Sequence, residues 1–312
     1  MKKVLLVVLA VAMLFAFQGV SDAKELKDAK IGLSVHFKTD DYGVICSKGF
    51  EDTCKAAGVG TYTVLDANSD AQKQLSDIES FIAQKYDAIV VSPVDDQAVK
   101  DVINTASAQG ILVSVITTVP EANVFCTVEA GNYEFSAEVA EKLCEKMGYK
   151  GKVALMDIPT TLWRTGRRLQ AFQDVIAKYP DLKVVALEKK MLPDEAKTAA
   201  ENLLTANPDL GGIFGTFSNV TYGAGAAARD MNRKEVVCGG VDADMSILEL
   251  MRDGWIYSVA AQIPDTHGIM GAQAVIDGLQ GKIVPKEMNA VYKIYVQGEE
   301  KKAAKEVWGK DF

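Results

Sequence analysis

Strand-like and helix-like segments alternate along almost the whole chain. Residues 30–37, 88–91 and 111–116 form short apolar runs, as expected for parallel strands that are buried on both faces. Segments with apolar residues at helical spacing, such as residues 71–85, follow these runs. About ten such strand–helix units are too many for one small sheet. The sequence therefore predicts an α/β fold with two doubly wound parallel sheets.

The composition is that of a soluble globular protein and argues against several function classes. Apolar residues make up 48% and charged residues 24% of the 312 residues, so a large core can form. The formal net charge of −8 and the lack of a basic stripe argue against a nucleic-acid partner. His36 and His267 are the only histidines, which argues against a histidine-rich metal site. We expect no metal and no cofactor.

Residues 1–23 have the pattern of a secretory signal peptide. Two lysines precede a short apolar run, residues 4–17, and residues 21–23 provide small side chains at the cleavage positions. The run is too short to span a bilayer and is followed by a cleavage pattern rather than by a stop-transfer pattern. We therefore expect an exported protein whose mature form begins at Lys24. An uncleaved anchor is the alternative.

The five cysteines do not suggest a disulfide framework, because their number is odd and their spacing is irregular. Cys126 and Cys144 are the one pair for which a disulfide stays open. Buried free thiols, acting as small apolar residues, are the interpretation that we favour.

One segment resembles a dinucleotide-binding fingerprint. Residues 223–228 match its loose glycine pattern after a predicted strand, and Asp242 lies about 20 residues further on. The segment lies late in the chain, and an exported protein normally meets no nicotinamide cofactor. We therefore expect small residues that let a helix pack closely on a sheet. The motifs of serine hydrolases, zinc proteases and P-loop proteins are missing, so we predict that the chain is not an enzyme.

Two pairs of adjacent acids lie between a predicted strand and a predicted helix. Such pairs can perform acid–base chemistry, but aspartate is also a common helix cap. We expect Asp95 and Asp96 to be caps. For Asp40 and Asp41 both interpretations stay open, because their loop ends the first strand of a sheet.

Five short motifs resemble segments of one known family in their order and spacing. They are Ser92-Pro93-x-Asp95-x-x-Ala98-Val99, Arg168-x-x-x-Phe172, Asn202-Leu-Leu-Thr-Ala-Asn-Pro-Asp209, Gly239-Gly-Val-Asp242 and Ala261-Gln262-Ile-Pro-Asp265. From Ile31 to Gln297 the chain resembles the periplasmic sugar-binding proteins of the ribose-binding-protein-like family, which are the substrate-binding components of ABC importers. The resemblance implies a type I periplasmic binding protein.

Such a protein has two doubly wound lobes joined by a three-segment hinge. The resemblance divides the chain into an N-terminal lobe (24–130 plus 263–291), a C-terminal lobe (131–262 plus 292–298) and a C-terminal tail (299–312). The hinge would lie near residues 130–132, 262–264 and 290–292. The ligand would bind where the carboxyl edges of the two sheets face each other. We expect the tail to be a docked or frayed helix without a functional role.

The resemblance also implies ligand-binding positions. Asp242 and Gln262 match directly; a carboxylate accepts hydroxyl hydrogen bonds, and an amide both donates and accepts them. Arg168 also matches and offers a fork of donors. The first strand and the loop after it contribute His36, Asp40 and Tyr42, where the family has a polar residue, an asparagine and a stacking aromatic.

Other positions depart from the family pattern. Thr117 and Thr118 replace an Asp-Arg pair, and Gly43 stands where a second aromatic would stack. The family's asparagine after a later strand is Phe217 here, or Ser218-Asn219 if the loop shifts. These departures leave the class intact but leave the identity of the ligand open.

Trp163 and Arg164 are further candidates. Trp163 could supply the stacking that Gly43 cannot, or it could pack at the start of a helix. Asp40 and Asp242 would face Arg168 and Arg164, so the charges of the pocket roughly balance. Because a buried unpaired charge is costly, we predict a neutral ligand.

These inferences lead to one predicted function with two alternatives. We expect a monomer in the periplasm that binds a small polyhydroxy ligand, such as a monosaccharide or a sugar alcohol, and delivers it to an ABC transporter permease. A chemoreceptor is a second candidate partner. The alternatives are a ligand carrier for a chemoreceptor or sensor kinase without transport and, more remotely, an exported Rossmann-like enzyme.

Overall fold

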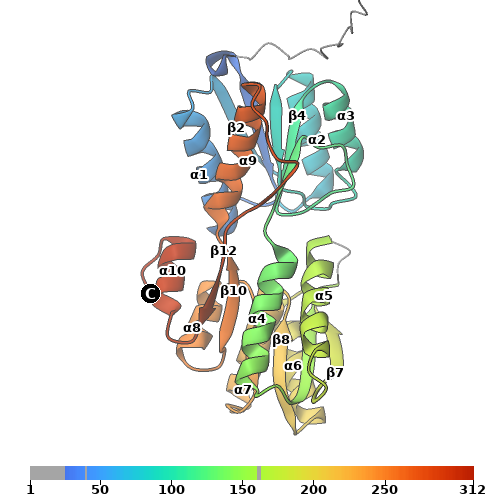
Figure 1. The fold of residues 1–312 in the computed structure, drawn as a ribbon, viewed down its shortest axis with the longest axis vertical. Helices are drawn as coiled ribbons and strands as arrows, with labels where there is room; N and C mark the ends of the chain where they lie inside the picture. The colour runs from blue at the N-terminus through green and yellow to red at the C-terminus, as the bar shows by residue number, and fades with distance from the viewer. Residues whose placement is uncertain (1–24, 39–40, 160–162) are drawn as a thin grey trace, which may run out of the picture.

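The computed structural model describes residues 25–38, 41–159 and 163–312. These residues form two lobes, one above the other along the long axis of the molecule (Figure 1). The predicted signal peptide and Asp40 lie outside the described residues.

The upper lobe contains a six-stranded sheet with the strand order β11-β5-β4-β3-β1-β2, and every neighbouring pair in it is parallel. Its strands are β1 (Lys30–Val35), β2 (Thr61–Asp66), β3 (Ala88–Val91), β4 (Leu112–Ile116), β5 (Cys126–Glu129) and β11 (Glu287–Asn289). The short 3-10 helix η1 (Leu26–Asp28) precedes β1. Helices α1 (Asp41–Ala56) and α9 (Pro264–Leu279) share one core with the sheet, and α2 (Ala71–Ala83) and α3 (Lys100–Ala108) share another.

The lower lobe contains a second six-stranded sheet with the order β12-β10-β9-β8-β6-β7, in which only β12 is antiparallel to its neighbour. Its strands are β6 (Gly151–Asp157), β7 (Leu182–Lys189), β8 (Leu210–Gly215), β9 (Val237–Val241), β10 (Ser258–Gln262) and β12 (Tyr292–Val296). Helices α4 (Asn132–Lys146) and α5 (Trp163–Ala177) share one core with this sheet. The other core contains α6 (Pro193–Ala206), α7 (Ser218–Asp230), α8 (Met245–Arg252) and α10 (Glu300–Trp308).

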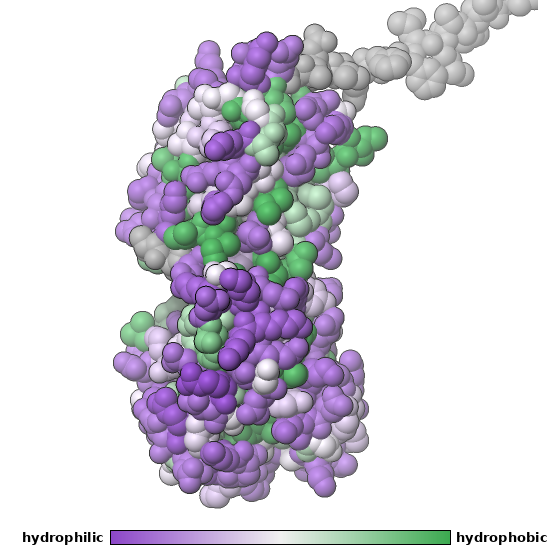
Figure 2. Space-filling model, turned by 90° about the vertical axis from the view of Figure 1, so that its left-hand side faces the viewer, coloured by the Kyte–Doolittle hydropathy of each residue, from purple (hydrophilic) through white to green (hydrophobic). Residues whose placement is uncertain are grey.

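The chain passes between the two sheets three times among the described residues. It leaves the upper sheet after β5, returns from β10 into α9, and leaves again between β11 and β12. The predicted α/β fold with two doubly wound, mostly parallel sheets joined by three segments is confirmed. Figure 2 shows the lobes meeting at a narrow waist, with hydrophilic residues over most of that face.

The glycine-rich segment of α7 has a packing role. A Cβ atom on Gly223 would lie 2.7 Å from the Cβ of Ala196 in α6, and one on Gly225 would lie 2.6 Å from Ile256. The sequence predicted close packing, but on a sheet; at these two glycines the close neighbours are helix α6 and Ile256, which follows α8.

The five cysteines are all buried free thiols, as the sequence analysis favoured. Cys126 lies against Ser114 rather than against Cys144, with 3.3 Å between Sγ and the serine Oγ. In the part of the chain that the structure describes, no helix has the length and apolar character needed to span a membrane.

Candidate ligand-binding site

A cavity of about 280 Å³ lies between the two lobes. The upper lobe lines it with His36, Tyr42 and Thr117. The lower lobe contributes Arg164, Arg168, Phe217, Ser218, Asn219, Asp242, Ala243, Asp244, Gln262, Val307 and Trp308. The volume is at the small end of the range for small-molecule sites, which suits a ligand of monosaccharide size.

The carboxyl ends of parallel strands from both sheets lead into this cavity. Thr117 directly follows β4 and Asp242 directly follows β9. Both residues have left-handed backbones, with φ values of 75° and 74°. This conformation is unfavourable for non-glycine residues, above all for a β-branched threonine, and such strain gathers at functional sites. Each lobe therefore contributes one residue with a strained backbone, at the end of a strand, to the lining of the cavity.

Arg168 is the main buried cation of the site, with 1% of its surface exposed. Its Nε donates to Asn132 Oδ1 at 2.7 Å, and its Nη1 donates to the carbonyl oxygen of Thr216 at 3.3 Å. The same Nη1 lies 3.8 Å from Asp242 Oδ2. Burial lowers the pKa of Arg168, and the nearby Asp242 carboxylate opposes that change. The guanidinium is thus held in a fixed orientation beside its counter-charge.

Asp242 is held by groups that leave part of its carboxylate free. The backbone N–H of Ser218 donates to Oδ2 at 3.1 Å, and Gln262 Nε2 donates to Oδ1 at 3.3 Å. The hydroxyl of Ser218 donates to Asp244 in turn. A carboxylate has about four acceptor positions, so Asp242 can accept further bonds from ligand hydroxyls.

Among the described residues, the upper side of the cavity includes the aromatic side chains of His36 and Tyr42, both neutral at neutral pH. The ring of Tyr42 lies 5.7 Å from that of His36 and 5.9 Å from that of His267, measured between centroids. Burial lowers the pKa of His36 to about 4 and that of His267 to about 3. His36 Nδ1 also lies 2.8 Å from Ser92 Oγ, a hydrogen bond that fixes its ring.

The sequence matches the family described as "Periplasmic binding protein domain" over residues 31–283. The chain belongs to this family. The predicted family is thereby confirmed, and so is the prediction of a binding protein rather than an enzyme.

Curated relatives of this periplasmic binding protein carry sugar and polyol names. The ribose import binding protein of Bacillus subtilis (strain 168) is 28% identical over 281 residues, which cover 89% of this chain and 90% of that protein. The xylitol-binding protein of Mycolicibacterium smegmatis is 25% identical over 276 residues, which cover 86% of this chain and 78% of that protein.

Solved structures share the fold of this periplasmic binding protein. An ABC transporter periplasmic solute-binding protein from Actinobacillus succinogenes, with bound D-allose, superposes with a TM-score of 0.80 at 23% identity, covering 88% of this chain and 99% of the other. The arabinose-binding protein AraP of Geobacillus stearothermophilus gives a TM-score of 0.77 at 25% identity, covering 88% and 98%.

Most residues that the sequence singled out lie together around the cavity of this periplasmic binding protein. They are His36, Tyr42, Thr117, Arg164, Arg168, Phe217, Asn219, Asp242 and Gln262. Thr118 does not line it, because its buried hydroxyl donates to Asp96 at 3.1 Å. Trp163 also lies outside the cavity; the residue is 37% exposed, and its ring centroid lies 5.9 Å from the guanidinium carbon of Arg167.

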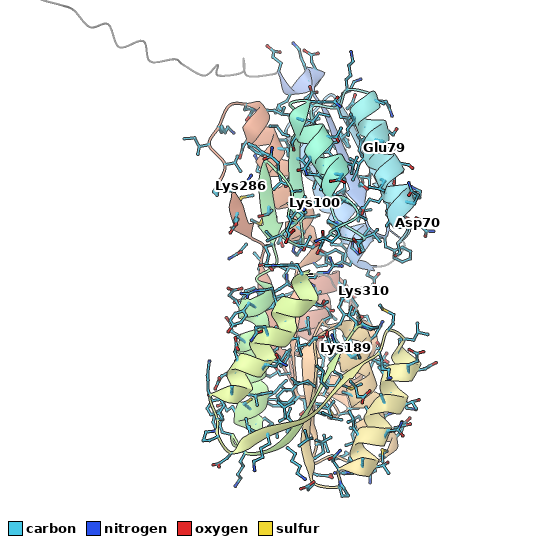
Figure 3. All side chains as sticks on the ribbon, turned by 90° about the vertical axis from the view of Figure 1, so that its right-hand side faces the viewer. Asp70, Glu79, Lys100, Lys189, Lys286 and Lys310 are labelled. Atoms are coloured by element: carbon cyan, nitrogen blue, oxygen red, sulfur yellow. The ribbon has the colours of Figure 1, made fainter. Side chains whose placement is uncertain are left out.

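Helix α10 adds a wall that the sequence analysis did not expect. The tail was predicted to have no functional role, but Val307 and Trp308 line the cavity. Trp308 Nε1 donates to the carbonyl oxygen of Ala243 at 2.7 Å, which holds the ring in place. Lys310, just beyond the helix, pairs with Asp41 of the upper lobe and lies at the junction of the lobes in Figure 3. The apolar residues in an otherwise charged tail were the signal that this segment is docked.

This arrangement is suited to reversible binding. It combines guanidinium donors, carboxylate acceptors, an amide and aromatic faces in one enclosed space. Within residues 25–38, 41–159 and 163–312, no group of three or more histidine, cysteine or acidic side chains could hold a metal ion.

Proposed function

We propose that this protein captures a small neutral polyhydroxy molecule, such as a monosaccharide or a sugar alcohol, by closing its two lobes around it. The observation that carries the proposal is the cavity between the lobes, where polar and aromatic side chains from both lobes converge. Hydroxyl groups can pair with the charged and amide groups, while the aromatic faces suit the C–H surfaces of a sugar ring.

The charges that line the cavity support a neutral ligand. Among the described residues that line the cavity, Arg164 and Arg168 are positive and Asp242 and Asp244 are negative, so the two signs are equal in number there. A strongly charged ligand would leave one charge uncompensated in a buried place, which is unfavourable.

Transport is the process that fits such a protein. The relatives named above include a ribose import binding protein and a solute-binding protein of an ABC transporter. We infer that this chain is exported to the periplasm with the help of residues 1–23 and that it delivers its ligand to the permease of an ABC importer. Ligand contacts with both lobes would favour the closed form, and the three connecting segments would serve as the hinge.

A thermal-shift screen of the chain from Lys24 tests the proposed ligand class. The screen compares pentoses, hexoses, alditols and inositols with amino acids, organic acids and amines. A neutral polyol at a hundredfold excess over its Kd should stabilise the protein by about 2.7 kcal/mol, which raises its Tm. A shift with an organic acid or an amine only, and with no polyol, would contradict the proposal.

Two adjacent arginines provide a matched control for the site. Arg168→Met should raise the Kd of the best polyol about 100-fold, because it removes charge-assisted hydrogen bonds. Arg167→Met should leave the Kd within threefold, because Arg167 lies over the ring of Tyr133, outside the cavity. If Arg168→Met does not fold, Asp242→Asn tests the same charge pair. If Arg167→Met and Arg168→Met bound the polyol with equal affinity, the proposed placement of the ligand beside Arg168 would be contradicted.

A further inference from the structure

A carboxylate of the upper lobe accepts a hydrogen bond from the first residue of a helix of the lower lobe. The backbone N–H of Trp163, where α5 begins, donates to Asp96 Oδ2 at 3.1 Å. The hydroxyl of Thr118, in the upper lobe, donates to the same oxygen at 3.1 Å. Asp96 is only 6% exposed. The N-terminus of a helix carries unpaired N–H groups and a partial positive charge, so a carboxylate there is favourable.

The same junction contains a buried guanidinium nitrogen on a residue that lines the ligand site. Arg164, one residue along α5, lines the cavity, and its buried Nη1 has no hydrogen-bond partner among the described residues. Within the part of the chain that the structure describes, Oδ1 of Asp96 is also buried without a partner. Burial lowers the pKa of Arg164, and the charge of Asp96 is the largest influence that opposes this change. The carboxylate therefore stabilises the charged form of a side chain that faces the ligand.

The neighbouring acid shows that this contact is no ordinary cap. Asp95 accepts hydrogen bonds from the backbone N–H groups of Gln97 and Ala98, at 2.9 and 2.8 Å, and so caps its own turn. Asp96 bonds instead to residues that are 22 and 67 positions away. The sequence analysis predicted capping for both acids; this is correct for Asp95, whereas Asp96 joins the two lobes.

We propose that Asp96 is a positioning residue that couples ligand binding to lobe closure. In the closed form it holds the first turn of α5 and stabilises Arg164 against the cavity. Opening of the lobes would separate Asp96 from Trp163, so this contact belongs to the closed form alone. The inference rests on the proposed function, because it assumes that closure accompanies ligand capture.

The test compares Asp96→Asn with Asp95→Asn, two neutralising changes at adjacent positions. Binding of D-ribose, D-arabinose, D-allose and xylitol is measured by titration calorimetry. Asp96→Asn keeps an oxygen for the Trp163 N–H but loses the charge that faces Arg164. We expect its Kd to rise about tenfold for each sugar that binds, with faster dissociation. Asp95→Asn should stay within twofold, because asparagine is an equally good cap.

A second readout separates positioning from stability. Spin labels on cysteines placed at Glu79 of α2 and Glu195 of α6, both exposed, report the distance between the lobes with and without sugar. The native cysteines are buried and should not react. Asp96→Asn should lower the fraction of molecules with the short distance between labels that marks the closed form. The Tm of the ligand-free variant should stay within a few degrees of wild type.

The outcomes distinguish this inference from the proposed function. Equal Kd values and equal distance distributions for the 95 and 96 variants would overturn the role of Asp96 and leave the proposed function standing. A wild-type protein that binds none of the four compounds would count against the proposed function. The label distances of the ligand-free variants would then still decide whether Asp96 favours the closed form.

Discussion

At the residue scale, Trp308 is the part of the cavity wall that comes from furthest along the chain. It is also one of only three tryptophans, with Trp163 and Trp255. Because its indole lines the cavity and is fixed by a hydrogen bond to Ala243, a bound polyol should change its fluorescence.

We expect Trp308→Phe to abolish most of the sugar-induced change in tryptophan emission. Trp308→Ala should in addition raise the Kd about tenfold, because stacking and burial of an aromatic ring are lost. Trp255→Phe is the control, since Trp255 packs under Lys234 and does not line the cavity. A fluorescence change that survives in Trp308→Phe and disappears in Trp255→Phe would contradict the position of Trp308 in the wall of the ligand cavity.

The two histidines make stability depend on pH in a defined direction. The folded state holds the pKa of His36 at about 4 and that of His267 at about 3, below the ordinary value of 6.5. As the pH falls below about 6.5, the unfolded chain takes up protons that the folded protein does not, so stability is lost. Each buried histidine contributes a slope of up to about 1.4 kcal/mol per pH unit.

Urea unfolding at pH 7 and pH 5 measures this loss. His267→Leu should reduce the difference between the two pH values by about half, because one of the two titrating groups is gone. The carboxylates change little in this range, since their ordinary pKa values are about 4. A pH dependence equal to that of wild type would show that His267 is not held neutral by burial.

Many site residues could be predicted because they follow the strands. The carboxyl ends of parallel strands meet at one edge of each sheet, so the recognised strands place Asp242 and Gln262 at the edge of the lower sheet and Thr117 at the edge of the upper sheet. The predicted two-lobed arrangement makes these two edges face each other. The position of Trp308 depends on how the tail docks, which no local pattern specifies. Asp95 and Asp96 have the same local pattern, so only the packing of the other lobe distinguishes them.

At the element scale, helices α1 and α9 cross with almost no space between their backbones. A Cβ atom on Gly268 would lie 1.9 Å from the carbonyl oxygen of Cys46, and one on Gly49 would lie 2.6 Å from that of Asp265. Backbone atoms cannot move aside as a flexible side chain can, so these glycines allow the helices to approach each other.

Gly268→Ala should lower the free energy of unfolding by about 1–3 kcal/mol, because the helices must separate. Gly166→Ala in α5 is the matched change, since no atom of the described residues, apart from its chain neighbours and the nearby backbone of its own helix, lies within 4 Å of a Cβ there. It should raise stability by up to about 1 kcal/mol, because alanine is the better helix former. Chemical denaturation of both variants measures the difference. Equal effects would contradict the close crossing.

The elements that the sequence did not reveal are short or lie at a sheet edge. Helix α2 and the apolar strands β1, β3 and β4 were predicted close to their observed bounds. Strands β5 and β11 have only four and three residues, so they carry too little apolar pattern to be recognised alone. Strand β12 lies at the edge of its sheet and pairs with β10 in antiparallel orientation. It was recognised as a strand from this pairing and not from the sequence.

At the scale of the whole molecule, two lobes of similar construction both line the candidate ligand-binding cavity. The contacts that join them across it include the bond from Trp163 to Asp96 and the pair between Lys310 and Asp41. The second pair is exposed on both sides, so it should contribute little by itself. We therefore expect the proposed closure to depend mainly on the buried contacts and on a ligand that touches both lobes.

Small-angle X-ray scattering with and without the tightest-binding sugar tests this account most directly. Ligand contacts with both lobes should shift the population toward the closed form, so the radius of gyration should fall when the sugar is added. Asp242→Asn, at the same sugar concentration, should show a smaller decrease. A radius of gyration that does not change while calorimetry shows full occupancy would contradict capture by lobe closure.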